Sequence, residues 1–226
     1  FAQMVEAGCE YAVMEVSSQG IKMHRTDGLY FNYAIFTNIS PDHIGPGEHA
    51  DFEEYLYYKT RLLNMCGIGL VNKDDKHAPQ IIKAANCELY TYSEESKEAD
   101  FVASDIRYVS QPDFVGTEFH ISGKYDMEVR LGIPGLFNVV NALAAVSVCS
   151  FLGLDQARIS HALENIRVNG RMEIVYTSER CTVLVDYAHN AVSMESLLST
   201  LRDYKPKRLV CVFGCGGNRS KDRRYS

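Results

Sequence analysis

The sequence lacks the features that mark membrane-spanning and nucleic-acid-binding proteins. No uninterrupted apolar run among its 226 residues approaches the roughly 20 residues that cross a bilayer. No basic stretch followed by an apolar core and a cleavage site opens the chain. The formal net charge is -6 at pH 7, which argues against a surface for nucleic acid. We therefore expect a cytoplasmic protein with no membrane insertion and no nucleic-acid partner.

Cysteine spacings typical of a metal centre are missing as well. The seven cysteines are odd in number and scattered through apolar segments: Cys9, Cys66, Cys87, Cys149, Cys181, Cys211 and Cys215. This pattern indicates core thiols in a reducing compartment. A phosphate-cradling Gly-x-x-Gly-Lys-Thr/Ser loop is also absent from these residues.

The chain does have the composition of a globular protein, with 46% apolar and 23% charged residues. Its length suits one large domain or two small ones. Apolar runs alternate with helical segments over the first 92 residues, which predicts an α/β fold with a mostly parallel sheet. The expected strands are 11–14, 34–37, 68–72 and 88–92, with helices over 51–63 and 78–85.

The second half of the chain shows a different pattern. Three segments that alternate apolar and polar residues predict a small antiparallel sheet, namely 101–109, 114–122 and 125–131. After the break at Pro134-Gly135 we expect helices over 136–152 and 154–165. The remaining expected elements are a strand pair, 174–177 and 182–186, a helix over 191–204 and a strand over 208–213.

Polar side chains follow the first two expected strands. Glu15 comes directly after 11–14, and the loop 38–43 follows 34–37. Ligands bind at the carboxyl ends of strands in open α/β sheets. Glu15 and His43 can therefore meet there and offer a hard oxygen and an imidazole to a metal such as Mg²⁺ or Mn²⁺.

A lysine lies on the apolar face of the helix expected over 51–63. This face carries four residues at helical spacing: Phe52, Leu56, Lys59 and Leu63. Burial disfavours the ammonium form, so Lys59 could be a neutral amine that reacts with carbon dioxide to give a metal-binding carbamate. From spacing alone, the simpler interpretation is that its side chain extends to solvent at the helix end.

Three motifs here resemble the middle domain of the Mur ligase family: Glu-Val-Ser-Ser-x-Gly at 15–20, Phe-Thr-Asn-Ile-Ser-Pro-Asp-His at 36–43, and Phe-Glu-Glu-Tyr-Leu-Tyr-Tyr-Lys at 52–59. The resemblance implies a central ATP-binding domain over 1–171, with a mostly parallel sheet flanked by helices and a small antiparallel sheet. It implies that 172–226 begin a Rossmann-like C-terminal domain.

The motifs are most similar to the family members that add the third amino acid to UDP-N-acetylmuramoyl-L-Ala-D-Glu in peptidoglycan precursor synthesis. The resemblance implies an ATP-dependent ligase that uses Mg²⁺ and forms an acyl phosphate on D-Glu. The amine of a diamino acid, meso-diaminopimelate or L-lysine, then attacks that acyl phosphate. Whether the protein takes one or the other is left open by these residues. We expect a monomer.

Two alternatives stay open at this point. One is a folylpolyglutamate synthase-like ligase, which shares an Asp-x-Ala-His-Asn motif such as the one at 186–190. The other is a non-catalytic relative that only binds nucleotide or a partner. Because the phosphate loop is missing, we expect these residues to be a fragment that is inactive on its own.

The resemblance also implies roles for individual residues. Carbamylated Lys59, with Glu15 and His43, would bind magnesium, and Lys59, Arg171 and His43 would be catalytic. The residues implied to contact the substrates are Ser17, Arg25, Thr37, Asn38 and Arg219. Taken alone, the residues favour the simpler interpretation that Ser17 is an N-cap residue and Arg25 a solvated surface arginine.

The nucleotide site implied by the resemblance lies later in the chain. Its members are Asn138, Asn141, Arg171, Asp186, Tyr187 and His189. The two asparagines would lie against adenine, and Arg171 would reach the phosphates. Asn138 could instead cap the helix that it opens. The pair Asp74-Asp75 reads as a turn and helix cap more than as a metal site.

Overall fold

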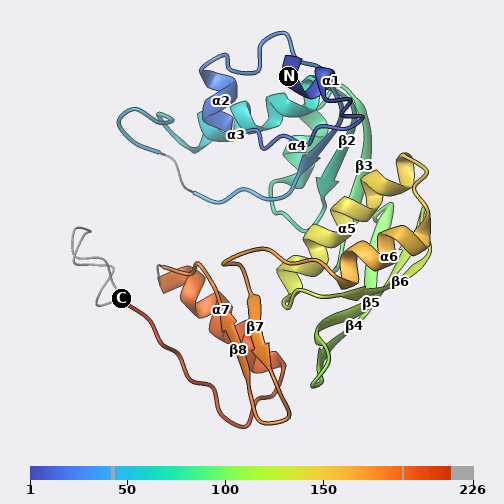
Figure 1. The fold of residues 1–226 in the computed structure, drawn as a ribbon. Coiled ribbons are helices and arrows are strands. Elements are labelled where there is room, and N and C mark those ends of the chain that lie inside the picture. The colour runs from blue at the N-terminus through green and yellow to red at the C-terminus, as the bar shows by residue number, and fades with distance from the viewer. Residues whose placement is uncertain (42–43, 190, 215–226) are drawn as a thin grey trace. The chain divides into compact units, whose positions relative to one another are not determined.

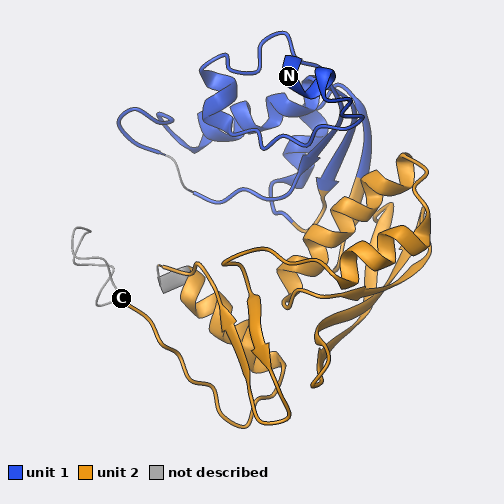
Figure 2. Cartoon of the chain, in the orientation of Figure 1, with its two compact units in different colours: residues 1–71, 75–90 blue, residues 72–74, 91–226 orange. Residues whose placement is uncertain are grey.

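The computed structural model describes residues 1–41, 44–189 and 191–214 (Figure 1). The chain divides into two compact units, drawn in different colours in Figure 2. Unit 1 comprises residues 1–71 and 75–90, and unit 2 comprises residues 72–74 and 91–226. Of the helices in the described part of the chain, none combines the length and the apolar character that a membrane span needs.

Unit 1 is built from four helices and a parallel strand pair. The helices are α1 (Ala2–Glu6), α2 (Ser18–Lys22), α3 (Phe52–Arg61) and α4 (Ala78–Ala84), and a short 3-10 helix, Leu62–Asn64, follows α3. Strands β1 (Phe31–Phe36) and β2 (Cys66–Asn72) pair in parallel. Leu63 of the 3-10 helix, Val71 of β2 and Ile81 of α4 are fully buried in one hydrophobic core cluster.

Strand β3 (Glu88–Ser93) begins in unit 1 and ends in unit 2. Unit 2 continues with β4 (Phe101–Ser110), β5 (Val115–Gly123) and β6 (Met127–Leu131). The six strands lie in the sheet in chain order; β3 and β4 are parallel, whereas β4, β5 and β6 are antiparallel neighbours. The expected antiparallel strands are thus confirmed, and they extend the sheet that the parallel strands begin.

Two helices cover the antiparallel part of unit 2. Helix α5 (Leu136–Phe151) packs on β4 and β5, and α6 (Gln156–Glu164) packs on β6. Gly135 is the N-cap residue of α5 and has φ 106°, a conformation that strongly favours glycine. The break that the sequence places at Pro134-Gly135 therefore fixes where α5 begins.

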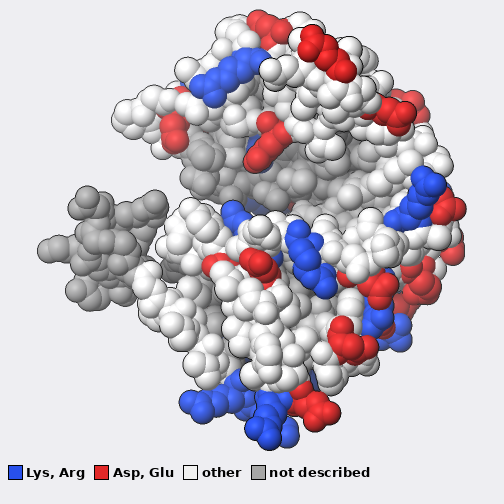
Figure 3. Space-filling view, viewed as in Figure 1, with Lys and Arg blue, Asp and Glu red and all other residues white. Residues whose placement is uncertain are grey.

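Unit 2 ends with a hairpin and a helix. Strands β7 (Glu173–Thr177) and β8 (Thr182–Val185) form a two-stranded antiparallel sheet, and α7 (Ala191–Asp203) follows. The Tyr204 hydroxyl group, just beyond α7, lies 3.1 Å from Thr117 Oγ1 and 3.2 Å from the Gly135 amide nitrogen. On the face shown in Figure 3, acidic and basic side chains are interspersed.

The α/β fold class is confirmed, but two expected strands are wrong. Residues 11–14 and 208–213 form neither helix nor strand, and Val13 and Val212 are almost fully exposed. A strand is stable only where a neighbour accepts and donates its backbone hydrogen bonds. In the described part of the chain, neither segment has such a neighbour.

Candidate functional site

Helix α3 places Lys59, and its sequence explains why it forms there. The Asp51 side chain caps the helix by accepting a hydrogen bond from the Glu54 amide at 2.8 Å. Acidic residues occupy the first turn, and Lys59 and Arg61 the last, which complements the helix dipole. The cap and the charges fix the helical register, so Lys59 lies beside Tyr55 on the inner face.

Replacing Asp51 with alanine is expected to lower the free energy of unfolding by about 1 kcal/mol, because the Glu54 amide loses its acceptor. Urea unfolding followed by circular dichroism measures this change. Glu53→Gln removes a charge from the same turn without touching the cap and is expected to cost less than about 0.5 kcal/mol. Equal effects of the two substitutions would contradict the capping role.

The Lys59 ammonium group is held at the end of β1. Its Nζ atom donates a hydrogen bond to the backbone oxygen of Asn38 at 2.5 Å. It also lies 5.5 Å from the centre of the Phe36 ring and 5.6 Å from that of Tyr55. Lys59 therefore does not simply extend into solvent, because its charged end has a fixed place between two rings and a carbonyl group.

Burial lowers the pKa of Lys59, while the negative charge of Asp75 acts in the opposite direction. A lowered pKa increases the share of neutral amine at a given pH, and only the neutral amine reacts with carbon dioxide. Carbamylation of Lys59 stays a prediction, and this environment favours it.

Asp75 fixes the loop that accepts the Lys59 hydrogen bond. One of its carboxylate oxygens accepts from the Ile39 amide at 2.7 Å, and the other from the His77 amide at 2.8 Å. Asp74 separately accepts from the Glu94 amide at 2.9 Å. The turn interpretation of Asp74-Asp75 agrees with these bonds, because both carboxylates hold backbone amides.

The other metal and substrate residues expected in unit 1 are less constrained. Glu15 lies exposed in coil, and among the described residues it has no hydrogen bond or ion pair. His43 lies outside the described residues. Within the described part of the chain, no group of three or more His, Cys, Asp or Glu is arranged to hold a metal. Thr37 is exposed beside Asn38, whose backbone oxygen, not its side chain, contacts Lys59.

Ser17 and Arg25 lie at the two ends of the α2 region. The Ser17 hydroxyl oxygen accepts from the Gly20 amide at 3.0 Å, so Ser17 is the N-cap residue of α2. Its hydroxyl group can still donate its own proton to a substrate. Arg25 is exposed, and among the described residues its guanidinium group approaches only the Met23 sulfur, at 3.5 Å. Their substrate contacts stay predictions.

A second cluster lies in unit 2, around the loop between β8 and α7. Asp186 accepts hydrogen bonds from the Met172 and Ala188 amides, both at 2.8 Å. The Arg171 guanidinium group lies over the Tyr187 ring, 4.8 Å from its centre. His189 Nδ1 is 2.9 Å from the Tyr187 backbone oxygen.

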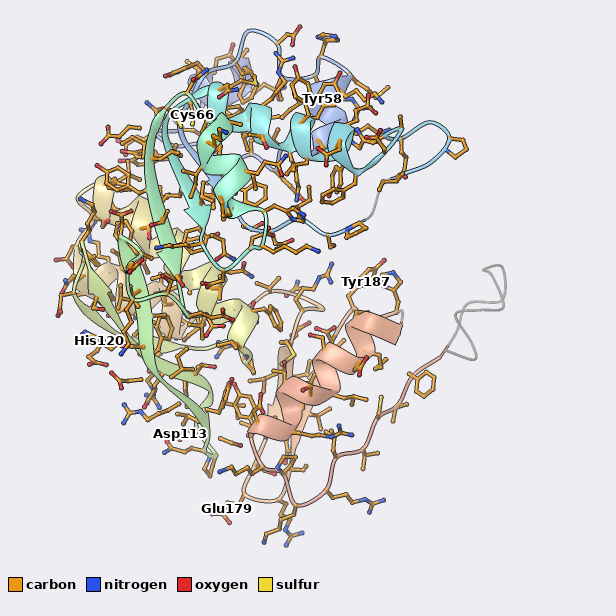
Figure 4. All side chains as sticks on the ribbon, turned by 180° about the vertical axis from the view of Figure 1, so that it is seen from behind. Tyr58, Cys66, Asp113, His120, Glu179 and Tyr187 are labelled. Atoms are coloured by element: carbon orange, nitrogen blue, oxygen red, sulfur yellow. The ribbon has the colours of Figure 1, made fainter. Side chains whose placement is uncertain are left out.

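Four of the residues predicted to bind nucleotide therefore lie together in this cluster. Asp186 holds the backbone of two segments, while Arg171, Tyr187 and His189 remain exposed at the surface. Figure 4 labels Tyr187 in the loop that precedes α7. The permanently charged guanidinium group can bind phosphate, and the exposed aromatic rings beside it can stack on a base.

The predicted adenine residues lie on α5. The Asn138 side chain is buried and donates to the Pro134 backbone oxygen at 2.6 Å. The N-cap residue of α5 is Gly135, so the capping interpretation of Asn138 is wrong. Asn141, one turn further along α5, is exposed. Arg219 and the end of the Asp-x-Ala-His-Asn motif lie outside the described residues.

Sequence reasoning missed one part of unit 1, a polar network that contains Ser18, His49 and Glu54. His49 Nε2 is 2.9 Å from Ser18 Oγ, and His49 Nδ1 is 3.7 Å from a Glu54 carboxylate oxygen. His49 is fully buried. The sequence carries no periodic signal for this network, because its members come from two helices and the loop between them.

Comparison with known protein families places this chain among ligases. Residues 1–149 match the family described as the Mur ligase middle domain, and residues 170–226 match the family described as the Mur ligase glutamate ligase domain. The chain belongs to the Mur ligase family.

Individual relatives agree with this assignment. The chain is 38% identical over 221 residues to UDP-N-acetylmuramoyl-L-alanyl-D-glutamate–2,6-diaminopimelate ligase 2 of Clostridium acetobutylicum, covering 97% of this chain and 44% of that protein. A solved structure of a ligase with the same diaminopimelate-adding name has a TM-score of 0.78 and 30% identity, over 97% of this chain and 45% of the other. The chain thus spans less than half the length of the relatives that it matches.

A folylpolyglutamate synthase from Mycobacterium tuberculosis is a more distant structural match. Its TM-score is 0.57 at 21% identity, over 76% of this chain and 39% of the other. This similarity concerns the fold alone.

Proposed function

We propose that the protein in which this chain occurs is an ATP-dependent ligase that adds diaminopimelate to UDP-N-acetylmuramoyl-L-Ala-D-Glu. The observation that carries the proposal is the environment of Lys59, whose amine is held at the carboxyl end of β1 by Asn38. Relatives that are 38% and 30% identical to this chain are named for this reaction. Of the two diamino acids that the resemblance allowed, those names favour diaminopimelate.

The residues of unit 1 suit a magnesium ion. Glu15 presents an exposed carboxylate, and a carbamate on Lys59 would add two further oxygen atoms. Hard oxygen donors of this kind are the ligands that Mg²⁺ prefers. Magnesium, when bound, would neutralise charge on the phosphoryl group that moves from ATP to the D-Glu carboxylate. His43 would complete the set of predicted ligands.

The residues of unit 2 suit the nucleotide. Arg171 carries a permanent positive charge, which can stabilise the charge that develops on a transferring phosphoryl group. Tyr187 and His189 present rings on the same loop, and Asp186 keeps that loop in place through two backbone amides. Asn141 offers an exposed amide on α5, which can donate to and accept from a base edge.

The proposal is tested by phosphate release from ATP with the polypeptide in which these 226 residues occur. The assay contains UDP-N-acetylmuramoyl-L-Ala-D-Glu and one of diaminopimelate, lysine or ornithine, with a folate and glutamate control. We expect release that depends on both the muramoyl dipeptide and diaminopimelate. Dependence on lysine would correct the amino acid, whereas release only with folate and glutamate, or none at all, would overturn the proposal.

A further inference from the structure

The loop from Ile44 to Ala50 is fastened to α2 and α3 by a set of polar contacts in unit 1. Three of its contacts are with α2: the Gly47 backbone oxygen accepts from the Gln19 side chain at 3.0 Å, the Glu48 backbone oxygen accepts from the Lys22 side chain at 3.0 Å, and His49 contacts Ser18. The fourth is with α3, where the Ala50 amide donates to the Glu54 carboxylate at 2.7 Å. The loop therefore connects the segment that begins at Ser17 with the helix that carries Lys59.

His49 is the centre of this connection. Its ring is fully buried and stacks on Tyr55, with ring centres 5.2 Å apart, and lies 5.8 Å from the Tyr58 ring centre. Figure 4 labels Tyr58 on α3, the helix that packs against α2. Nε2 of His49 lies 2.9 Å from Ser18 Oγ on α2. Nδ1 lies 3.7 Å from a Glu54 carboxylate oxygen on α3, beyond hydrogen-bond distance, and has no hydrogen-bond partner among the described residues.

The negative charge of Glu54 favours one tautomer of His49. A hydrogen bond from Lys22 at 2.8 Å, together with one from the Ala50 amide, lowers the pKa of Glu54, so this carboxylate is ionised at neutral pH. A negative charge 3.7 Å from Nδ1 favours a proton on that nitrogen. Nε2 is then an acceptor, and the Ser18 hydroxyl group donates to it.

Ser18, His49 and Glu54 have the order of a serine-nucleophile triad, but burial excludes that chemistry. Ser18 is only 5% exposed and His49 is 0% exposed, so a substrate carbonyl group cannot approach the Ser18 oxygen. A buried hydrogen bond between side chains 31 positions apart instead fixes the geometry of the two elements that it joins.

We propose that His49 is a positioning residue, which holds Ser17 at a fixed place relative to α3 and Lys59 through its hydrogen bond with Ser18. The inference rests on the proposed function, in which these residues bind the muramoyl dipeptide and magnesium. Ser17 is the direct neighbour of Ser18, and Tyr55 lies one helical turn before Lys59. A displacement of His49 therefore changes the position of Ser17 relative to Lys59.

Three substitutions separate the hydrogen bond from the packing of the ring. His49→Phe keeps an aromatic ring against Tyr55 but loses the acceptor for Ser18, whereas His49→Gln loses the ring and keeps a polar group. Ser18→Ala removes the donor. We expect His49→Phe and Ser18→Ala each to raise the KM for the muramoyl dipeptide about tenfold, with kcat changed less than about threefold.

Two further results are required by the proposal. The double variant should have the KM of either single variant, because both substitutions break the same bond. His49→Gln should recover most of the affinity. His161→Phe, an exposed histidine of α6, is the matched control and should leave KM unchanged. Unchanged KM in His49→Phe, or additive effects in the double variant, would overturn the inference.

Amide hydrogen exchange tests the inference without activity. In His49→Phe, residues 15–22 should exchange at least tenfold faster than in the wild type, while α5 keeps its protection. Unchanged exchange in 15–22 would overturn the positioning role. Faster exchange, combined with a wild-type protein that ligates no diamino acid, would leave the positioning role in place and overturn the proposed function alone.

Discussion

Replacing Lys59 with alanine is expected to lower kcat for diaminopimelate ligation at least about 1,000-fold, the size of effect that follows loss of a group that stabilises charge in the transition state. Among the described residues, the Lys59 side chain makes one hydrogen bond, to Asn38 at the end of β1, so alanine removes the functional group while β1 keeps its pairing with β2. Steady-state phosphate release over a range of Mg²⁺ concentrations measures the effect.

Two variants make this prediction specific. Lys59→Arg keeps a positive charge but cannot form a carbamate, so it is expected to be as inactive as Lys59→Ala. Lys83→Ala removes an exposed lysine from the last turn of α4 and should change kcat less than about twofold. An active Lys59→Arg would show that the residue works as a cation, and would contradict the carbamate. Labelling with ¹³C-bicarbonate should give a carbamate signal in the wild type only.

Lys59 also shows which part of the site can be predicted from sequence. Helix α3 follows from local signals, namely the Asp51 cap and the spacing of Phe52 and Leu56. Those signals fix which face of the helix Lys59 occupies. They do not fix what it touches, because Asn38 lies 21 residues away and meets Lys59 only through the packing of α3 beside β1.

Two segments were wrongly predicted as strands because their local sequence favours a strand but provides no pairing neighbour. Residues 11–14 and 209–213 have apolar side chains, several of them β-branched or aromatic, and such residues favour strands. Strand formation also needs a paired neighbour, which is not a property of the segment itself. The antiparallel strands β4, β5 and β6 were predicted correctly because each has its partner next in sequence.

The functional motifs show the same limit at the level of single side chains. The motif at 186–189 was recognised from its residues, yet its role in holding Met172 depends on an amide 14 residues earlier. The predicted contact of Asn138 with adenine stays a prediction, and the sequence did not indicate that its amide group donates to Pro134. His49 carried no motif, and only the fold brings it to Ser18. Residue types indicate chemistry, and tertiary structure selects the partners.

The core of unit 2 provides the largest expected effect on stability. Phe101 is 0% exposed on β4, pairs with Tyr92 of β3 and Gly123 of β5, and meets the Phe151 ring of α5 edge to face at 5.6 Å. Phe101→Ala is expected to lower the free energy of unfolding by about 3–5 kcal/mol, because it opens a cavity between the sheet and α5. Urea unfolding of the wild type and the variant measures this loss.

A phenylalanine on α5 is the matched control for Phe101. Phe137 is 45% exposed, so Phe137→Ala removes the same side chain from a site that water already reaches, and should cost less than about 1 kcal/mol. A domain is typically stable by only about 5–15 kcal/mol, so Phe101→Ala should also shift the urea midpoint clearly below that of Phe137→Ala. Equal losses of unfolding free energy in the two variants would mean that α5 does not pack on β4 through Phe101. Removing a ring leaves a cavity only where the ring is fully buried between its neighbours.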